Sequence, residues 1–242
     1  MAVHETNAMG QPLDVPVPQW TARPSPPRDP MIGRTCRIEP LESSRHAADL
    51  FAADSRDTDG RSWTYLPYGP FASLADYTAW VDTVTAVPDP MFHAIVDLAT
   101  GRAVGVASYL RIDGAAGSIE VGHIHYSPLL QRTVAATEAM YLMMQRAFAL
   151  GYRRYEWKCD ALNAASRAAA QRLGFSYEGI FRQARVSKGR NRDTAWYAMI
   201  DREWPALDTA FSTWLSPANF DANGRQKASL SALTAPILVA RG

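Results

Sequence analysis

One stretch constrains the fold more than any other: residues 131–139, which read QRTVAATEA. A strand-like run (119–126) precedes this stretch, and a long helix-like run (135–150) follows it. A polar loop that leads directly into a helix presents several backbone N–H groups at the helix N-terminus, where the helix dipole adds partial positive charge. Arg132 adds a full charge, and two threonines add hydroxyl groups. The segment therefore predicts an anion site suited to a pyrophosphate.

A second motif strengthens this interpretation. Asn163-Ala164-Ala165-Ser166-Arg167 begins another helix-like run, and that run ends in Arg172-Leu173-Gly174-Phe175. In this order and spacing, the two motifs resemble the cofactor-binding core of the GNAT superfamily, the N-acetyltransferases that use acetyl-coenzyme A. The resemblance covers roughly residues 31–205. It is nearest to the ribosomal-protein alanine N-acetyltransferase branch, whose loop commonly continues into Ala-Thr-Glu-Ala, as residues 136–139 do here.

The resemblance implies where acetyl-CoA would bind. In this family the loop holds the pyrophosphate, the later helix lies along the pantetheine arm, and the strand before the loop pairs with the pantetheine. The implied cofactor-binding residues are Ile124, His125, Tyr126, Gln131, Arg132, Thr133, Val134, Ala135, Ala136, Thr137, Asn163, Ser166 and Arg167.

The loop departs from the family pattern at Val134, which occupies the position of a glycine. Glycine serves where the backbone approaches a ligand closely or adopts a positive φ, and a β-branched valine does neither at low cost. We expect the loop to hold a shape compatible with valine, with Arg132 compensating by direct charge pairing. The alternative is a weaker grip on the cofactor.

The order of the predicted elements indicates an α/β fold of the α+β type. A meander of strands comes first and a β-α-β-α-β succession follows, which predicts a mixed, mostly antiparallel sheet with helices on both faces. Residues 1–30 form a proline-rich arm, 31–205 the acyltransferase domain, and 206–242 a helical appendage and tail. Trp20 is expected to anchor the arm on the domain or on a neighbouring subunit. The tail could dock on the core, close the active site or mediate dimerisation.

Acyl transfer to an amine needs a group that accepts the proton of the amine, because an amine of lysine type is mostly protonated at neutral pH. Glu120 is the first candidate, since an ionised carboxylate in an apolar strand is costly unless it has a function or a partner. Strand alternation predicts that it shares a face with Ile124 and Tyr126, and that His123 and His125 lie opposite. A structural carboxylate is the equally weighted alternative for Glu120.

Two further residues complete the predicted catalytic set. His125 has a side chain suited to moving protons near neutral pH, although a strand histidine is more often structural. GNAT enzymes often carry a tyrosine where this chain has Ala170, so Ser166 or a water molecule would protonate the departing thiolate. A thiol has a pKa of about 8.5, so the thiolate leaves readily and a general acid is dispensable.

The acceptor site is expected under an aromatic, turn-rich segment (63–71). In GNAT-like folds this region overlies the acceptor cleft, and rigid aromatic rings line binding pockets well. The predicted substrate-binding residues are Trp63, Tyr65, Tyr68 and Phe71. The same rings could instead pack beneath the loop.

Composition excludes several other classes. A net charge of +1 gives no global field toward nucleic acid or membranes. A basic cluster near residues 182–192 is read first as a solvated hairpin rim, and otherwise as a contact for CoA phosphates or an acidic substrate. Cys36 and Cys159 lie in apolar runs, which indicates buried thiols in a reducing, cytoplasmic setting. The histidines lack metal-ligand spacing, so no metal is expected.

These observations predict an acetyl-CoA-dependent N-acetyltransferase that acts on a primary amine of a small molecule or amino acid, by direct attack in a ternary complex. The alternatives are acetylation of a protein N-terminus and a non-catalytic acyl-CoA-binding protein. No nucleic acid or membrane partner is expected, and a homodimer remains open.

Overall fold

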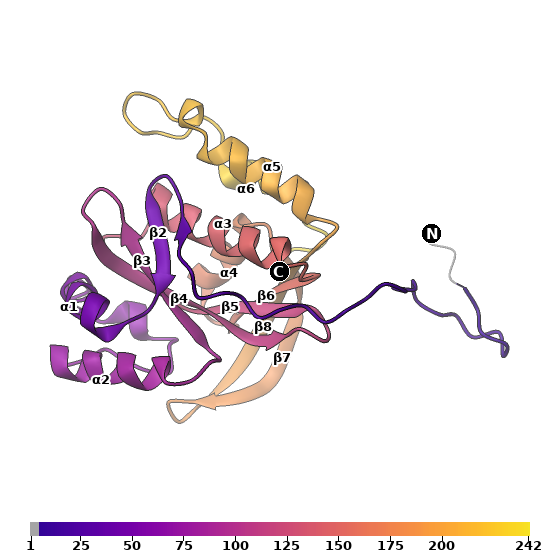
Figure 1. Cartoon of the computed structure of the whole chain (residues 1–242), viewed down its shortest axis with the longest axis horizontal. Coiled ribbons are helices and arrows are strands. Elements are labelled where there is room, and N and C mark those ends of the chain that lie inside the picture. Colours follow the sequence, from indigo (N-terminus) through magenta and orange to yellow (C-terminus); the bar gives the residue numbers. More distant parts are fainter. Residues whose placement is uncertain (1–4) are drawn as a thin grey trace.

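The computed structural model describes residues 5–242, and an eight-stranded sheet of order β1-β2-β3-β4-β5-β6-β8-β7 forms its centre (Figure 1). Only β5 and β6 run parallel; all other neighbours pair antiparallel. The mixed, mostly antiparallel sheet predicted from the sequence is confirmed. The strands are β1 (Met31–Ile32), β2 (Cys36–Pro40), β3 (Met91–Asp97), β4 (Arg102–Asp113), β5 (Ser118–Tyr126), β6 (Arg154–Asp160), β7 (Ser176–Ser187) and β8 (Arg190–Ile200).

Helices cover both faces of the sheet, as expected (Figure 1). One face carries α1 (Ser43–Asp54) and α2 (Leu74–Thr85), joined through the 3-10 turn η1 (Arg61–Trp63). The other face carries α3 (Val134–Ala149), α4 (Ala164–Arg172) and α5 (Trp204–Leu215). The chain continues into η2 (Pro217–Asn219) and α6 (Leu230–Thr234).

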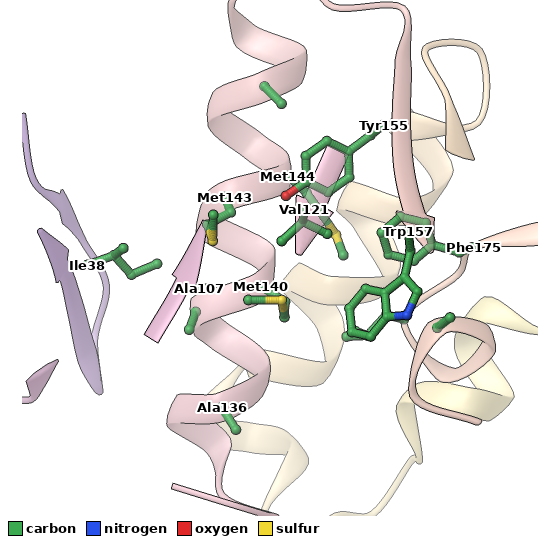
Figure 2. Packing of buried hydrophobic residues seen from close by; sticks show 14 of the residues in the cluster. Ile38, Ala107, Val121, Ala136, Met140, Met143, Met144, Tyr155, Trp157 and Phe175 are labelled. Atoms are coloured by element: carbon green, nitrogen blue, oxygen red, sulfur yellow. The ribbon is translucent and has the colours of Figure 1, made fainter. Parts of the chain in front are cut away.

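The larger core lies between the sheet and α3. In β6, alternate residues Tyr155, Trp157 and Cys159 are buried on this face, as the period of two in a strand requires. Methionines on one side of α3 pack against them, and Figure 2 shows Met140, Met143 and Met144 beside Val121 and Tyr155. Both cysteines are buried here, as expected, and both are free thiols.

A smaller core fills the α1–α2 face. Leu50 of α1, Tyr77 and Val81 of α2, and Phe92 of β3 are almost fully buried there. The aromatic segment between the two helices packs into the same cluster through Trp63. Side chains of β5 and β6 that point to this face therefore lie on the same side of the sheet as the aromatic segment.

A β-bulge in β5 changes the face assignment made from the sequence. Val106 of β4 pairs with His125 and Ser108 pairs with Gly122, so β5 carries one residue more than its partner over this interval. His123 takes the extra position with φ 50. The bulge reverses the alternation: Ile124 and Tyr126 pack toward the larger core, whereas His125 stacks on Trp63 on the opposite face. The prediction that Glu120 shares a face with Ile124 and Tyr126 was therefore wrong.

The two parallel strands separate part-way along their length. β5 and β6 pair from Ser118↔Arg154 to Val121↔Trp157, and the pairing ends there although both strands continue. Beyond this point the backbone groups of the facing edges are not used by the partner strand. The sheet therefore has an opening between β5 and β6 near its centre.

The two ends of the described chain contact the domain differently. Trp20 of the proline-rich arm donates from Nε1 to the Ala115 oxygen at 2.7 Å, while residues 5–19 extend away from the domain (Figure 1). The C-terminal tail docks on the core: the N–H of Tyr177 on β7 donates to the Ala240 oxygen at 3.1 Å, and Thr234 Oγ1 donates to the Arg172 oxygen. Of the three roles considered for the tail, docking is the one observed.

Candidate active site

A cavity of about 590 Å³ opens where β5 and β6 separate. Its walls come from both strands, from the loop that carries η1, from the start of α4 and from the β7–β8 hairpin. Of the residues predicted for catalysis, cofactor binding and acceptor binding, five line the cavity: Tyr65, Glu120, Ile124, Asn163 and Ser166. The fold thus brings together one predicted catalytic carboxylate, one aromatic residue of the predicted acceptor site and three residues of the predicted cofactor site.

Glu120 is a buried carboxylate held by two cations. Its Oε2 lies 2.6 Å from Arg111 Nη1 and 2.8 Å from Lys158 Nζ, and only 3% of the residue is exposed. Lys158 also pairs with Glu156 at 2.7 Å. These pairs offset the cost of burying the charge. They also fix the carboxylate beside Gly122, at the mouth of the gap between the strands.

His125 lies beneath the cavity and reaches it through Ser62. The Nε2 atom of His125 is hydrogen-bonded to Ser62 Oγ at 2.9 Å, and Ser62 lines the cavity and donates to Asp57. On its other side, Nδ1 lies 3.4 Å from Asp54 Oδ1. Burial lowers the pKa of His125 to about 4, so its ring is neutral at pH 7. Burial raises the pKa of Asp54 to about 7.

The aromatic segment roofs the cavity. Tyr65 lines it, and its hydroxyl donates to the Leu162 oxygen at 3.2 Å; Lys188 at the hairpin tip donates to the Trp63 oxygen at 3.0 Å. Trp63 itself is buried and stacks on His125 with ring centroids 3.6 Å apart. Tyr68 and Phe71 pack against Trp80 and Tyr77. Of the four predicted substrate-binding rings, the structure places one in the cavity wall and three in the packing beneath it.

The predicted pyrophosphate loop lies at the N-terminus of α3, apart from the cavity wall. Thr133 caps the helix, because its Oγ1 accepts the N–H of Ala136 at 3.1 Å. The N–H groups of Val134 and Ala135 have no partner inside the helix. The only positive φ in this loop belongs to Arg132 (φ 62), while Val134 is the first helical residue. The positive φ that glycine would favour is therefore adopted by Arg132, and Val134 has an ordinary helical conformation.

Other loop side chains hold the local structure. Gln131 donates to the Tyr126 oxygen at 2.7 Å, and the Tyr126 hydroxyl donates to the Ala136 oxygen at 3.2 Å. Thr137 Oγ1 accepts a hydrogen bond from Arg172 at 2.8 Å and is buried. Two expected phosphate ligands, the hydroxyls of Thr133 and Thr137, thus already have partners within the protein.

The second motif begins α4 as predicted. Asn163 is the N-cap and accepts the N–H of Ser166 at 3.1 Å. Ser166 Oγ accepts a hydrogen bond from Trp157 Nε1 at 3.0 Å. Arg167 points elsewhere: it donates to the Tyr197 hydroxyl and to the Ala161 oxygen. Asn163 and Ser166 therefore line the cavity at its α4 end, whereas Arg167 does not line it and contacts Tyr197 of β8 instead.

Sequence reasoning missed most of the far wall. Phe181, Arg185, Arg192, Thr194 and Trp196 of the β7–β8 hairpin line the cavity. The basic cluster was read first as a solvated hairpin rim and otherwise as a contact for CoA phosphates or an acidic substrate, but nothing in the linear sequence indicates that β8 of this hairpin pairs with β6. Pairing of Lys158 with Trp196 across β6 and β8 is what brings the two walls together.

Residues 5–242 contain no group of three His, Cys, Asp or Glu side chains arranged to hold a metal ion, and the expectation of no metal stays an expectation. No helix in that range has the length and apolar character needed to cross a membrane.

Comparisons with known proteins agree with this architecture. The family model for an acetyltransferase (GNAT) domain matches residues 36–176. A GCN5-related N-acetyltransferase from Brucella melitensis is 47% identical with a TM-score of 0.88, over 90% of this chain and 100% of that one. A GNAT-family protein from Chromobacterium violaceum ATCC 12472 is 40% identical with a TM-score of 0.75, over 81% of this chain and 98% of that one.

A more distant structure shares the fold. It is an acetyltransferase from Salmonella typhimurium that modifies the N-terminal serine of 50S ribosomal subunit protein L7/L12, 20% identical with a TM-score of 0.60, over 71% of this chain and 99% of that one. No curated protein matches the chain. The family model spans more than half of the chain and the Brucella protein aligns over nearly all of it, so this chain belongs to the GNAT family of acetyltransferases, which transfer the acetyl group of acetyl-CoA.

Proposed function

We propose that this protein transfers the acetyl group of acetyl-CoA to a primary amine of a small molecule or amino acid, by direct attack within a ternary complex. The observation that carries the proposal is the cavity at the opening between β5 and β6, which joins the start of α4 to a carboxylate under the aromatic roof. Acetyl-CoA supplies the acyl group and a thiolate leaving group.

The chain has groups suited to bind each part of the cofactor. The N–H groups of Val134 and Ala135, with Arg132 beside them, suit the diphosphate. Asn163 and Ser166 border the path of the pantetheine arm. The edge of β5 beyond Val121 has backbone groups that β6 does not use, and a pantetheine amide can pair with them as an added strand would.

Glu120 is the proposed acceptor of the amine proton, directly or through one water molecule. It lines the cavity, makes ion pairs with Arg111 and Lys158, and lies at the point where the strands part. Ser62 and His125 form a second route for the proton, because the neutral ring of His125 is hydrogen-bonded to a hydroxyl in the cavity wall. Binding both substrates side by side supplies much of the rate by proximity.

A protein N-terminus is the second candidate acceptor. The Salmonella enzyme of the same fold acts on such a substrate. In this chain, Tyr65 of the aromatic segment is hydrogen-bonded to Leu162, and Lys188 of the β7–β8 hairpin is hydrogen-bonded to Trp63 of the same segment. These contacts over the cavity favour a compact acceptor over an extended polypeptide.

The proposal is tested by a screen that monitors free thiol released from acetyl-CoA in the presence of amino acids, small amines and short peptides. The expected result is thiol release that depends on a small amine and yields the N-acetylated product by mass spectrometry. Calorimetric binding of acetyl-CoA without thiol release for any amine would identify a binding protein instead. Release with peptides alone would identify a protein N-terminal acetyltransferase.

A further inference from the structure

A row of polar groups on β8 faces the cavity without a partner. Arg192 Nε, Thr194 Oγ1 and Trp196 Nε1 are each buried, and none has a hydrogen-bond partner among residues 5–242. The three residues alternate along one strand, so their side chains leave the same face, and all three line the cavity. Buried hydrogen-bonding groups in native proteins are almost always satisfied. Three unpaired hydrogen-bond donors on one strand therefore indicate a ligand that supplies acceptor atoms.

The charge of the cavity indicates what kind of ligand this is. Five cationic side chains line it (Arg111, Lys158, Arg182, Arg185 and Arg192), against two carboxylates (Glu120 and Asp160). Arg111 and Lys158 are already paired with Glu120. The three arginines of the hairpin make no ion pair within 4.0 Å to any described residue. The wall opposite Glu120 thus carries three arginines that are not engaged in close ion pairs.

The β8 row lies apart from the proposed diphosphate site at the N-terminus of α3. Ala195 and Tyr197, the residues between and beside the row, belong to the core under α3. Thr194 and Trp196 therefore point to the other face of the sheet, where Lys158 Nζ lies 3.8 Å from the centroid of the Trp196 ring. The N-terminus of α3 and its loop lie on the α3 face. A diphosphate bound there therefore lies on the opposite face of the sheet from the side chains of the β8 row.

We propose that the acceptor is an amine that also carries an oxyanion, a carboxylate or a phosphate, and that Arg192 and Thr194 bind that anion while the amine lies toward Glu120. This inference rests on the proposed function and names its substrate class. An arginine with an unused Nε–H presents a planar set of donors that matches a carboxylate or a phosphate. Thr194 and the Trp196 indole N–H add neutral donors to the same wall. The exposed Arg185, which pairs with Arg192 across the hairpin, adds charge at the entrance.

The test compares matched acceptors that differ only in the anion. Amino acids are assayed against their amides, and phosphoethanolamine against ethanolamine, which distinguishes a carboxylate from a phosphate. For the wild-type protein we expect kcat/KM at least 10-fold higher for the anionic member of one pair, since a charge-assisted hydrogen bond contributes enough for roughly 10- to 100-fold discrimination. Arg192→Met should remove that preference, lower kcat/KM for the anionic acceptor alone and leave the KM of acetyl-CoA unchanged. Thr194→Val should do the same more weakly.

Arg190→Met is the matched control, because Arg190 lies in the same hairpin but does not line the cavity. It should keep both the preference and the rate. Equal kcat/KM for both members of every pair would overturn the inference while leaving the acetyltransferase activity in place. A raised KM for acetyl-CoA in Arg192→Met, with the acceptor preference intact, would assign the row to the phosphates of CoA and would also overturn it.

A binding measurement decides the inference even if no amine is acetylated, an outcome that would count against the proposed function alone. Calorimetry with the protein saturated with coenzyme A should show tighter binding of the anionic amine than of its neutral partner, and Arg192→Met should abolish the difference. Equal affinities, or a difference that survives in Arg192→Met, would refute the anion site.

Discussion

Glu120 and Glu156 face each other across the β5–β6 pair and share the cation Lys158, yet only Glu120 lines the cavity. If Glu120 accepts the amine proton, Glu120→Gln should lower kcat about 100-fold or more, the usual range for loss of a general base. The dissociation constant of acetyl-CoA should stay within about twofold of wild type. Steady-state kinetics together with calorimetry measure both quantities.

The matched control is Glu156→Gln, which removes a neighbouring ion pair with the same lysine but no cavity carboxylate. It should change kcat by only a few-fold. Equal kcat losses in the two variants would mean that the charge balance around Lys158 matters rather than proton transfer. A wild-type rate in Glu120→Gln would shift the role of base to the Ser62–His125 route.

The Asp54 carboxyl gives a prediction for stability against pH. Burial raises its pKa from 3.8 in the unfolded chain to about 7 in the folded protein, so the folded state binds its proton more tightly. The contribution of Asp54 to the free energy of unfolding should therefore fall as pH rises from about 4 to about 7, and level off above that. Chemical denaturation of wild type and Asp54→Asn at several pH values measures it.

Relative to wild type, Asp54→Asn should gain stability across that window, by a few kcal/mol at most, since one pKa unit corresponds to about 1.4 kcal/mol. Burial lowers the pKa of the neighbouring His125 to about 4, so its contribution to the free energy of unfolding falls as pH drops below 6.5, and His125 is present in both proteins. A difference that is flat from pH 4 to pH 8 would show that Asp54 is not held protonated.

At the scale of elements, α3 is tied to the first hairpin by one carboxylate. Glu138 accepts the N–H groups of Arg34, Thr35 and Cys36, at distances from 2.6 to 3.2 Å, and also the Thr35 hydroxyl. These bonds outweigh the opposing effect of burial and keep the pKa of Glu138 below its ordinary value. The Ala-Thr-Glu-Ala motif, recognised in the sequence by resemblance, thus has a structural role in holding the β1–β2 turn.

Glu138→Gln should lower the free energy of unfolding by about 2 kcal/mol, because charge-assisted hydrogen bonds to buried N–H groups weaken and one amide N–H meets other donors. Urea denaturation measures the loss. Glu178→Gln, which removes a more exposed ion pair with Arg154, should cost less than about 1 kcal/mol. Similar losses in the two variants would contradict the anchoring role.

The loop before α3 is the element on which cofactor binding depends. Arg132→Glu should weaken acetyl-CoA binding at least 10-fold, because it replaces attraction to the diphosphate with repulsion at the helix N-terminus. Arg56→Glu makes the same charge change at an exposed site beyond α1 and should leave the affinity within about twofold. Calorimetry compares them, and equal affinities would remove the loop from the cofactor site.

The elements that the sequence predicted well are those with strong local signals. The long helix expected over 135–150 (α3) and the helix expected to begin at the Asn163 motif (α4) follow from residue patterns that act over a few positions. The β5 bulge was not predicted, because an extra residue is defined only by pairing with β4. That single residue moved His125 to the face of Glu120 and next to Ser62.

At the scale of the molecule, the cavity joins segments that are far apart in the sequence. Glu120, Asn163 and Ser166 were predicted to belong to one site, and the structure places all three in the cavity wall. The opposite wall depends on β8 pairing with β6, and the roof depends on the hydrogen bond from Lys188 to Trp63. Such long-range contacts leave no trace in local composition, which is why the unpaired row on β8 could be found only in the folded chain.

The central claim is that the loop before α3 holds the diphosphate of acetyl-CoA so that the acyl end reaches the opening beside Glu120. A crystal structure of the protein with coenzyme A tests it most directly. We expect the diphosphate against the N–H groups of Val134 and Ala135, and the thiol between β5 and β6 beside Glu120. A diphosphate bound instead at the Arg182–Arg192 hairpin, or a thiol that lies outside the opening between β5 and β6, would contradict it.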